Sequence, residues 1–163
     1  MEPVTDNGTL NELKERFGEA LIECGSDRGD LLAVVAKESI HQVVEFLKND
    51  PACDFTMLID LFGVDYSPRS PRFEVVYLLH SMKRGERLRL RVKIEEARCE
   101  LDTVSDFYPV ADWLERETWD MFGISFTGHP NLKRLLMYES FEGHPLRRDY
   151  QIDKRHPLVG PKE

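Results

Sequence analysis

Residues 115–137, ERETWDMFGISFTGHPNLKRLLM, bring together side chains that could act as acids, bases or metal ligands. At helical spacing only Glu117 and Asp120 share a face, while Glu115 lies nearly opposite Glu117. A glycosidase-type reaction needs two carboxylates several ångströms apart that flank a substrate cleft, which neighbours on one short helix do not provide. Arg116 can instead pair with Asp120 across one turn. We therefore predict a charged helix face and no catalytic residue.

Histidines and cysteines are the other candidates for chemistry. His129, His144 and His156 each precede a proline, which favours an extended backbone, so they lack the close spacing of a helical metal site. The sequence has three cysteines that lie far apart, Cys24, Cys53 and Cys99. Because no CxxC pair exists, we predict free thiols in a reducing compartment and no metal or cofactor bound by this chain alone.

Length and charge restrict the class of protein. A chain of 163 residues can bury a single core, and its net charge of −8 argues against nucleic acid as a partner. No run approaches the roughly 20 apolar residues of a membrane-spanning helix. The acidic, polar N-terminus is unlike a secretory signal. We predict that the protein stays on the cytoplasmic side of whatever membrane it may touch.

Hydrophobic periodicity predicts an α+β fold, with helices packed on one face of a mixed, mainly antiparallel sheet. Helices are expected at residues 10–17, 40–47 and 111–122, and strands at 20–24, 30–36, 55–64, 73–82 and 87–95. Thr9 and Glu12 form a capping-box pattern, and Asp112 and Glu115 form a similar pair. Gly63 indicates a bulge or bend within its strand.

The strand at 87–95 alternates strictly between apolar and basic residues. Its basic residues, which should share one face, are Arg87, Arg89, Arg91 and Lys93. A nucleic-acid platform would interleave aromatic residues for base stacking, and this strand has none. We predict a solvated or partner-facing sheet surface.

Residues 126–163 differ from the domain predicted for residues 1–125. From His129 onward seven Lys/Arg stand against five Asp/Glu, whereas the preceding residues are strongly acidic. Apart from LKRLLM the segment shows no sustained periodicity, yet it is too rich in aromatic and aliphatic residues for a disordered tail. We predict an extended C-terminal arm that lies across another protein.

A family signature lies in the same region. The chain has Glu115-Arg116-Glu117, then Asp120, Met121-Phe122, His129, Lys133 and Leu135-Leu136. This pattern resembles the signature of the thirty-kilodalton subunit family of proton-translocating NADH–quinone oxidoreductase, respiratory complex I. The likeness extends to LIDLFGVDY, PRFEVVYLLHSM and GHPLRRDY, and covers most of residues 54–150. Many constrained positions at fixed spacing are far more specific than a lone Gly-rich motif.

The resemblance implies a non-redox structural subunit in the peripheral arm of that enzyme, at the cytoplasmic face of the bacterial inner membrane. The assembly, rather than this chain, is expected to use NADH, FMN, iron–sulfur clusters and a quinone, and to couple electron transfer to proton translocation. The expected partners are other complex I subunits, chiefly the large subunit that borders the quinone site and the iron–sulfur subunits.

Roles for individual residues follow from the resemblance. The signature residues expected to pair with an adjoining subunit or to clamp the arm are Glu115, Arg116, Glu117 and Asp120, with His129 in the same signature. The residues expected to bind acidic surface on a neighbour are Lys133, Arg134, Arg147 and Arg148. Charged pairs at an interface specify its register more than they add affinity.

Two other functions remain open on the sequence. An equivalent subunit of a membrane-bound, energy-converting hydrogenase or a related complex would share the domain and the signature. A free-standing acid–base enzyme would use Glu117, Asp120 and His129. The neighbouring genes would separate the first from complex I, and a monomer in extracts without membranes would indicate the second.

Overall fold

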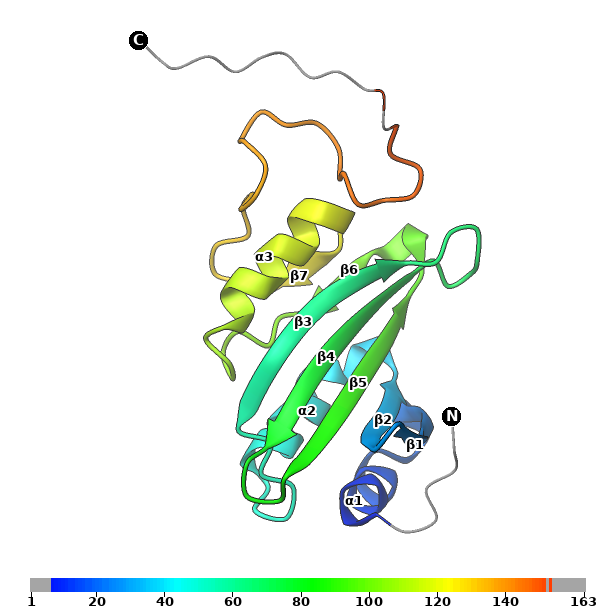
Figure 1. Cartoon of the computed structure of the whole chain (residues 1–163), viewed down its shortest axis with the longest axis vertical. Helices are drawn as coiled ribbons and strands as arrows, with labels where there is room; N and C mark the ends of the chain where they lie inside the picture. The colour runs from blue at the N-terminus through cyan, green and yellow to red at the C-terminus, as the bar shows by residue number, and fades with distance from the viewer. Residues whose placement is uncertain (1–6, 152, 154–163) are drawn as a thin grey trace.

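The computed structural model describes residues 7–151 and 153. Its helices and strands are α1 (Gly8–Phe17), β1 (Leu21–Asp27), β2 (Asp30–Val35), α2 (Ile40–Asn49), β3 (Met57–Asp65), β4 (Phe73–Ser81), β5 (Glu86–Ile94), β6 (Glu100–Asp102), α3 (Ala111–Phe122) and β7 (Ser125–Thr127). Three single 3-10 turns lie between them, at Gly18–Ala20, Lys37–Ser39 and Glu96–Arg98. The predicted helices and longer strands are all present (Figure 1).

Five strands form one sheet in the order β1-β2-β5-β4-β3. Neighbouring strands are antiparallel except β2 and β5, which are parallel. A second sheet contains only β6 and β7, paired in parallel. The predicted α+β class with a mixed, mainly antiparallel sheet is confirmed. The short strands β6 and β7 escaped prediction because three residues carry no readable alternation.

The core lies between the sheet and its helices, as Figure 1 shows for α2 behind the strands. The apolar residues of β5 are all buried against the helices, at Leu88, Leu90, Val92 and Ile94. Leu10 and Leu13 of α1 and Val43 and Leu47 of α2 belong to the same cluster. The basic residues of β5 therefore point to the opposite, outer face, as their alternation predicts.

Both predicted capping pairs are wrong. The N-cap of α1 is Asn7, whose side chain accepts the amide of Leu10, and the Thr9 hydroxyl instead donates to the Glu86 carboxylate. The Thr9 hydroxyl, which the local pattern assigned to capping the helix, thus makes a tertiary hydrogen bond instead. No side chain caps the start of α3. The helix follows directly on a turn in which the Ala111 amide donates a hydrogen bond to the Tyr108 carbonyl.

Gly63 is also not a bulge. It pairs regularly with Val75, and the register shift in β3 lies between Leu58 and Asp60. A Cβ at Gly63 would lie 2.8 Å from Cδ2 of Phe122 and 3.2 Å from Cγ2 of Thr118. The glycine therefore allows α3 to pack directly against β3, which fixes the helix that carries the family signature.

Residues after β7 do not leave the domain. β7 spans the predicted boundary at residue 126, and the chain then runs across the end of α3 toward the β3–β4 loop (Figure 1). The last residues of the predicted arm, 154–163, and His156 with them, lie outside the described residues. We use "arm" below for residues 128–151.

Candidate functional site

The candidate site is α3 together with the arm. Signature residues that we expected on a charged helix face are largely buried instead, namely Glu115, Arg116 and Asp120. Buried charges need partners. Each of these side chains finds its partners within this chain, so the signature first of all shapes the protein itself.

Asp120 is the main clamp on the arm. Its Oδ2 accepts the amides of three consecutive residues, Leu135 at 3.0 Å, Leu136 at 2.8 Å and Met137 at 2.9 Å. Its Oδ1 lies 2.6 Å from Nη1 of Arg134. Burial on its own raises the pKa of Asp120, but the amides and Arg134 outweigh burial, so the pKa is lowered below its usual value.

Arg116 holds the residues just before this clamp. Its Nε donates to the Lys133 carbonyl at 3.2 Å, and its Nη2 donates to the Arg134 carbonyl at 3.2 Å. The predicted pair between Arg116 and Asp120 is therefore replaced by two contacts to the arm. The guanidinium also lies 5.0 Å from the centre of the Trp113 ring, which orders that side chain.

Glu115 and His129 fix the point where the arm begins. Glu115 accepts the Val104 amide at 2.8 Å and the Thr103 hydroxyl. Burial raises the pKa of Glu115 to about 7, with nearby aspartates adding to the shift and these two hydrogen bonds opposing it. Because the carboxylate points to residues 103–104, it cannot cap its own helix with Asp112.

The His129 ring is fully buried beside Glu115. Its Nδ1 accepts the Asn131 amide, so in the neutral ring Nε2 carries the proton and donates to the Asp112 carbonyl at 3.1 Å. Nε2 also lies 3.1 Å from Oδ1 of Asp112 and 4.0 Å from Oε2 of Glu115. The histidine thus joins the first residues of the arm to the start of α3.

A second anchor holds the far end of the arm. Buried Arg72 makes a two-point contact with Asp65, at 3.0 Å and 2.8 Å, and its Nη1 reaches Glu96 and Asp149 at 2.7 Å and 3.0 Å. Asp65 also accepts the Arg148 amide at 2.9 Å. The hydrogen bond from Arg72 is the main cause that lowers the pKa of Asp65 to about 2. Sequence reasoning missed Arg72, which appeared to belong to an ordinary loop.

The basic residues assigned to a neighbour are partly engaged within the chain. Arg134 pairs with Asp120, and Arg147 contacts Glu96 and Asp149. Arg148 is exposed and its Nη1 donates to the Ser67 carbonyl at 2.9 Å. Lys133 projects outward and is exposed. Partner binding by these residues stays a prediction, and the exposed ones are the stronger candidates.

Several apolar side chains of α3 and the arm are exposed. Trp113, Leu136 and Leu146 are each 56% exposed, and Val110 is 45% exposed. Glu117 is exposed on the same helix, and its side chain makes no ion pair or hydrogen bond to any described residue. We call Val110, Trp113, Glu117, Lys133, Leu136 and Leu146 the α3–arm face. Sequence reasoning did not single out Trp113, although an exposed Trp is typical of interface hot spots.

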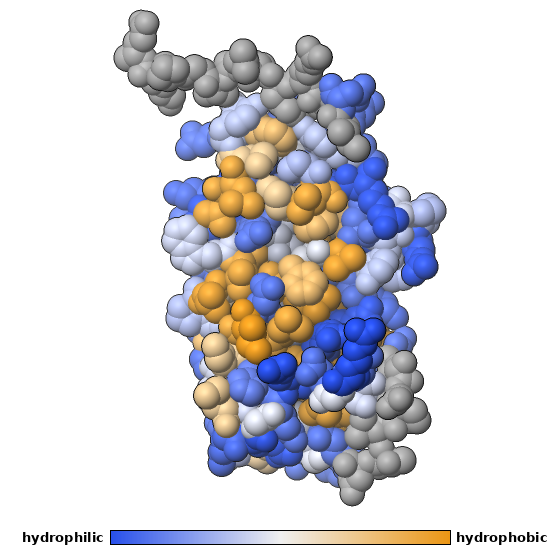
Figure 2. Space-filling model, in the orientation of Figure 1, coloured by the Kyte–Doolittle hydropathy of each residue, from blue (hydrophilic) through white to orange (hydrophobic). Residues whose placement is uncertain are grey.

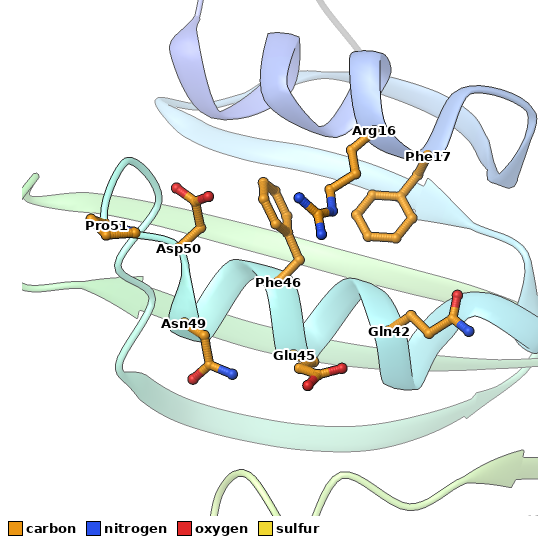
Figure 3. A pocket seen from close by; sticks show the side chains of 8 residues that line it. All are labelled: Arg16, Phe17, Gln42, Glu45, Phe46, Asn49, Asp50 and Pro51. Atoms are coloured by element: carbon orange, nitrogen blue, oxygen red, sulfur yellow. The ribbon is translucent and has the colours of Figure 1, made fainter.

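Among the described residues, the pockets elsewhere on the protein are not lined by the charged signature residues of α3. One of about 550 Å³ lies between α1 and α2 (Figure 3). Arg16 and Phe17 of α1 point toward Phe46 of α2 across it, with the Arg16 guanidinium 4.8 Å from the Phe46 ring centre. In the described part of the chain no three His, Cys, Asp or Glu side chains gather as metal ligands. None of the helices within residues 7–151 is long and apolar enough to cross a bilayer.

Comparison with known protein families shows the family to which the chain belongs. Residues 33–156 match the family described as respiratory-chain NADH dehydrogenase, 30 Kd subunit. The chain belongs to this family. Arg116 and Asp120, which clamp the arm, lie within the matched residues.

Relatives agree over most of the chain. The corresponding NADH-quinone oxidoreductase subunit of Citrifermentans bemidjiense is 44% identical over 156 residues, which are 96% of this chain and 92% of that protein. Its counterpart from Roseiflexus sp. is 46% identical over 90% of this chain and 85% of its own length.

Solved structures agree with the fold. A trypsin-resistant fragment of Nqo5 has a TM-score of 0.66 at 35% identity and covers 76% of this chain and 99% of the fragment. A chain of an archaeal membrane-bound sulfane sulfur reductase has a TM-score of 0.73 at 22% identity, covering 88% of this chain and 84% of its own length. The second likeness shows the shared fold alone.

Proposed function

We propose that this 30-kDa-family chain is a non-redox structural subunit in the peripheral arm of a NADH–quinone oxidoreductase. The assembly would pass electrons from NADH through FMN and iron–sulfur centres to a quinone and couple this transfer to proton translocation. The chain's own task would be to hold neighbouring subunits in place. Family membership and the names of the relatives support this assignment.

The observation that carries the proposal is the Asp120 clamp. A catalytic carboxylate needs an oxygen or a proton free for its substrate. Asp120 has both oxygens occupied by the arm, and Arg116 spends its donors on arm carbonyls. These residues shape a surface rather than attack a substrate. The surface that they shape is the α3–arm face, whose exposed Trp113 is suited to burial by a partner.

The expected partners are the large subunit at the quinone site and the iron–sulfur subunits. The protein would lie at the cytoplasmic face of the bacterial inner membrane and touch the membrane only through the complex. On the α3–arm face, Glu117 and Lys133 supply opposite charges beside apolar groups. Such charges select partner and register, while the aromatic group supplies most of the affinity.

The test is recovery of partners by tagged protein from mild-detergent membrane extracts. Wild-type chain should co-purify with complex I subunits. Glu117→Ala and Arg148→Ala should each reduce their recovery several-fold, because interface charges set partner and register, while the isolated variants keep the wild-type melting temperature. Lys14→Ala, an exposed cation on α1, is the matched control. Full recovery with both variants would contradict the assignment.

A related complex is a second candidate. The fold shared with a chain of the archaeal sulfane sulfur reductase shows that this architecture occurs in another respiratory membrane complex. Recovery of hydrogenase-type subunits in the same experiment would favour the energy-converting hydrogenase alternative. The acid–base enzyme is disfavoured, because it would require Asp120 to abandon the arm.

A further inference from the structure

The outer face of the main sheet has two unlike halves. Over β5, three of the four basic residues are paired with carboxylates, Arg89 with Asp27 and Asp30, Arg91 with Glu74, and Lys93 with Glu23. Over β3 the same face exposes three apolar side chains, although Asp60 of β3 and Glu74 and His80 of β4 also lie on it. Met57 is 48% exposed, Ile59 45% and Phe62 38%. Figure 2 shows these two regions as an apolar area bordered by strongly hydrophilic side chains.

This apolar half is hollowed. A depression of about 550 Å³ is lined by Met57, Ile59 and Phe62 of β3, Leu78 of β4 and Arg87 of β5, among others. The helices cover the opposite face of the sheet, and Figure 1 shows no helix in front of these strands. Exposed apolar side chains around a hollow are typical of a surface that another protein covers.

The charged residues on this surface indicate which charges a bound partner should carry. Arg87 is exposed on β5 and, unlike the other cations of this strand, has no carboxylate partner among the described residues. Asp60 lies on the same face of edge strand β3, opposite Leu78. The surface therefore carries a positive charge on its border with β5 and a negative charge on edge strand β3, beside the apolar residues of that strand.

The dimensions favour a helix. Neighbouring strands lie about 4.8 Å apart, so one helix of about 10 Å diameter covers two strands. A packed second sheet would need apolar residues across several strands, but the β5 part of this face consists of ion pairs. The apolar stripe of one amphipathic helix matches the width of β3 and β4.

We propose that the outer face of β3 and β4 is the docking site for one amphipathic α-helix of a partner protein. Its apolar stripe covers Met57, Ile59 and Phe62, an acidic residue on one flank pairs with Arg87, and a basic residue on the other flank faces Asp60. The helix adds a third layer to the fold. This surface is separate from the α3–arm face and does not rest on the function proposed for it.

Site-specific photo-crosslinking tests the docking site in membranes of cells that make the complex. Ile59 is replaced by p-benzoylphenylalanine in the full chain, and the crosslinked peptide is sequenced. Ile22, 55% exposed on the opposite edge strand β1, is the control position. We expect a crosslink from Ile59 to a different polypeptide, within a segment whose apolar residues recur at helical spacing and are flanked by Asp or Glu.

Charge reversal tests the ion pair expected at Arg87. Arg87→Glu should lower the crosslink yield at Ile59 about five-fold, and Lys14→Glu on α1, which changes the same charge on an exposed helix, should leave it unchanged. Circular dichroism verifies that both variants are folded. A crosslink to a second copy of this chain, to a segment without helical apolar spacing, or at no more than the Ile22 yield overturns the proposal. Equal yields from Arg87→Glu and wild type also overturn it.

Discussion

Asp120 links helix and arm through a carboxylate that is fully buried. Such a group is strongly stabilising only while all its partners remain, because an unpaired buried charge is costly. Asp120→Asn keeps the shape but loses the charge opposite Arg134 and weakens the bonds to three amides. We expect it to lower the free energy of unfolding by about 2–4 kcal/mol, measured by urea denaturation.

The matched control for Asp120→Asn is Glu117→Gln, the same change from carboxylate to amide at an exposed position of the same helix. It should alter the free energy of unfolding by less than about 0.5 kcal/mol. Hydrogen exchange adds a local readout, since the amides of Leu135, Leu136 and Met137 should lose protection in Asp120→Asn alone. Equal stability of the two variants would show that the clamp is unimportant.

Glu115 makes stability depend on pH. Its folded pKa of about 7 lies above the ordinary value of 4.5, so the folded state binds the proton more tightly than the unfolded state. Stability is therefore greatest below about pH 4.5 and declines until about pH 7, by up to about 3 kcal/mol from this group. Glu115→Gln should remove this decline, as measured by urea denaturation from pH 5 to 8.

Asp65 has the opposite sign and acts in a different range. Its pKa of about 2 lies below the ordinary 3.8, so its contribution is present above about pH 4 and is lost as pH falls toward 2.

The control for Glu115→Gln is Glu117→Gln, which should keep the wild-type decline in stability between pH 5 and 7. If Glu115→Gln keeps it as well, the buried carboxyl is not its source.

At the residue scale, the sequence was a better guide to which side chains are important than to which groups they contact. Helical spacing correctly separates Glu115 from Glu117 on α3. It cannot show that Asp120 binds backbone amides at positions 135–137, because an amide is the same for every residue type. Nor does spacing reveal Arg72, whose partners come from β3, the Glu96 turn and the arm.

At the element scale, the contact between α3 and β3 leaves the least space for a larger side chain. Gly63→Ala places a methyl group within about 3 Å of two α3 side chains, so helix and strand must separate slightly. We expect a loss of about 1–3 kcal/mol in the free energy of unfolding, measured by thermal or urea denaturation.

Gly8→Ala is the control for that substitution. Gly8 begins α1, and a Cβ there meets only the flexible end of Arg84 at 3.4 Å. Alanine favours helix over glycine, so this variant should be neutral or more stable by up to about 1 kcal/mol. A similar loss from both substitutions would mean that the packing of α3 on β3 is not the cause.

Elements with a clear period were predictable from the sequence, and elements fixed by tertiary contacts were not. Strict alternation in β5 and the apolar stripe of α2 gave strands and helices within a few residues of their bounds. The start of α1 and the role of Gly63 depend on Glu86 and α3, which are distant in sequence. The parallel pairing of β2 with β5 is likewise a property of the assembled sheet.

At the scale of the whole molecule, the arm is a shaped surface rather than a loose strap. Its unusual mixture of apolar and basic residues is visible in the sequence, and it led to the prediction of partner binding. Asp120 was among the residues expected to clamp the arm or to pair with a neighbour, although its backbone partners were not predicted. The Arg72 cluster was not visible, because it joins the arm to segments that lie far away in the sequence. Because the described part of the arm is already held against the domain, a protein that bound it would pay a lower entropic cost of association.

The central claim is that this chain serves its oxidoreductase by binding neighbours through the α3–arm face. Trp113→Ala tests it most directly, with Ile22→Ala, at a residue of nearly equal exposure on the opposite edge strand β1, as the control. Membranes carrying each variant are assayed for assembled complex by native electrophoresis and for NADH–quinone activity. Loss of a central Trp commonly costs about 2 kcal/mol or more of binding free energy, roughly a thirty-fold loss of affinity.

We predict that Trp113→Ala lowers the amount of assembled complex several-fold while the activity of each assembled complex stays at the wild-type level. Ile22→Ala should change neither quantity. Normal assembly with reduced turnover would contradict the claim, because Trp113 would then act in the reaction rather than in binding. Normal assembly with normal turnover would contradict it equally, because the α3–arm face would then hold no partner.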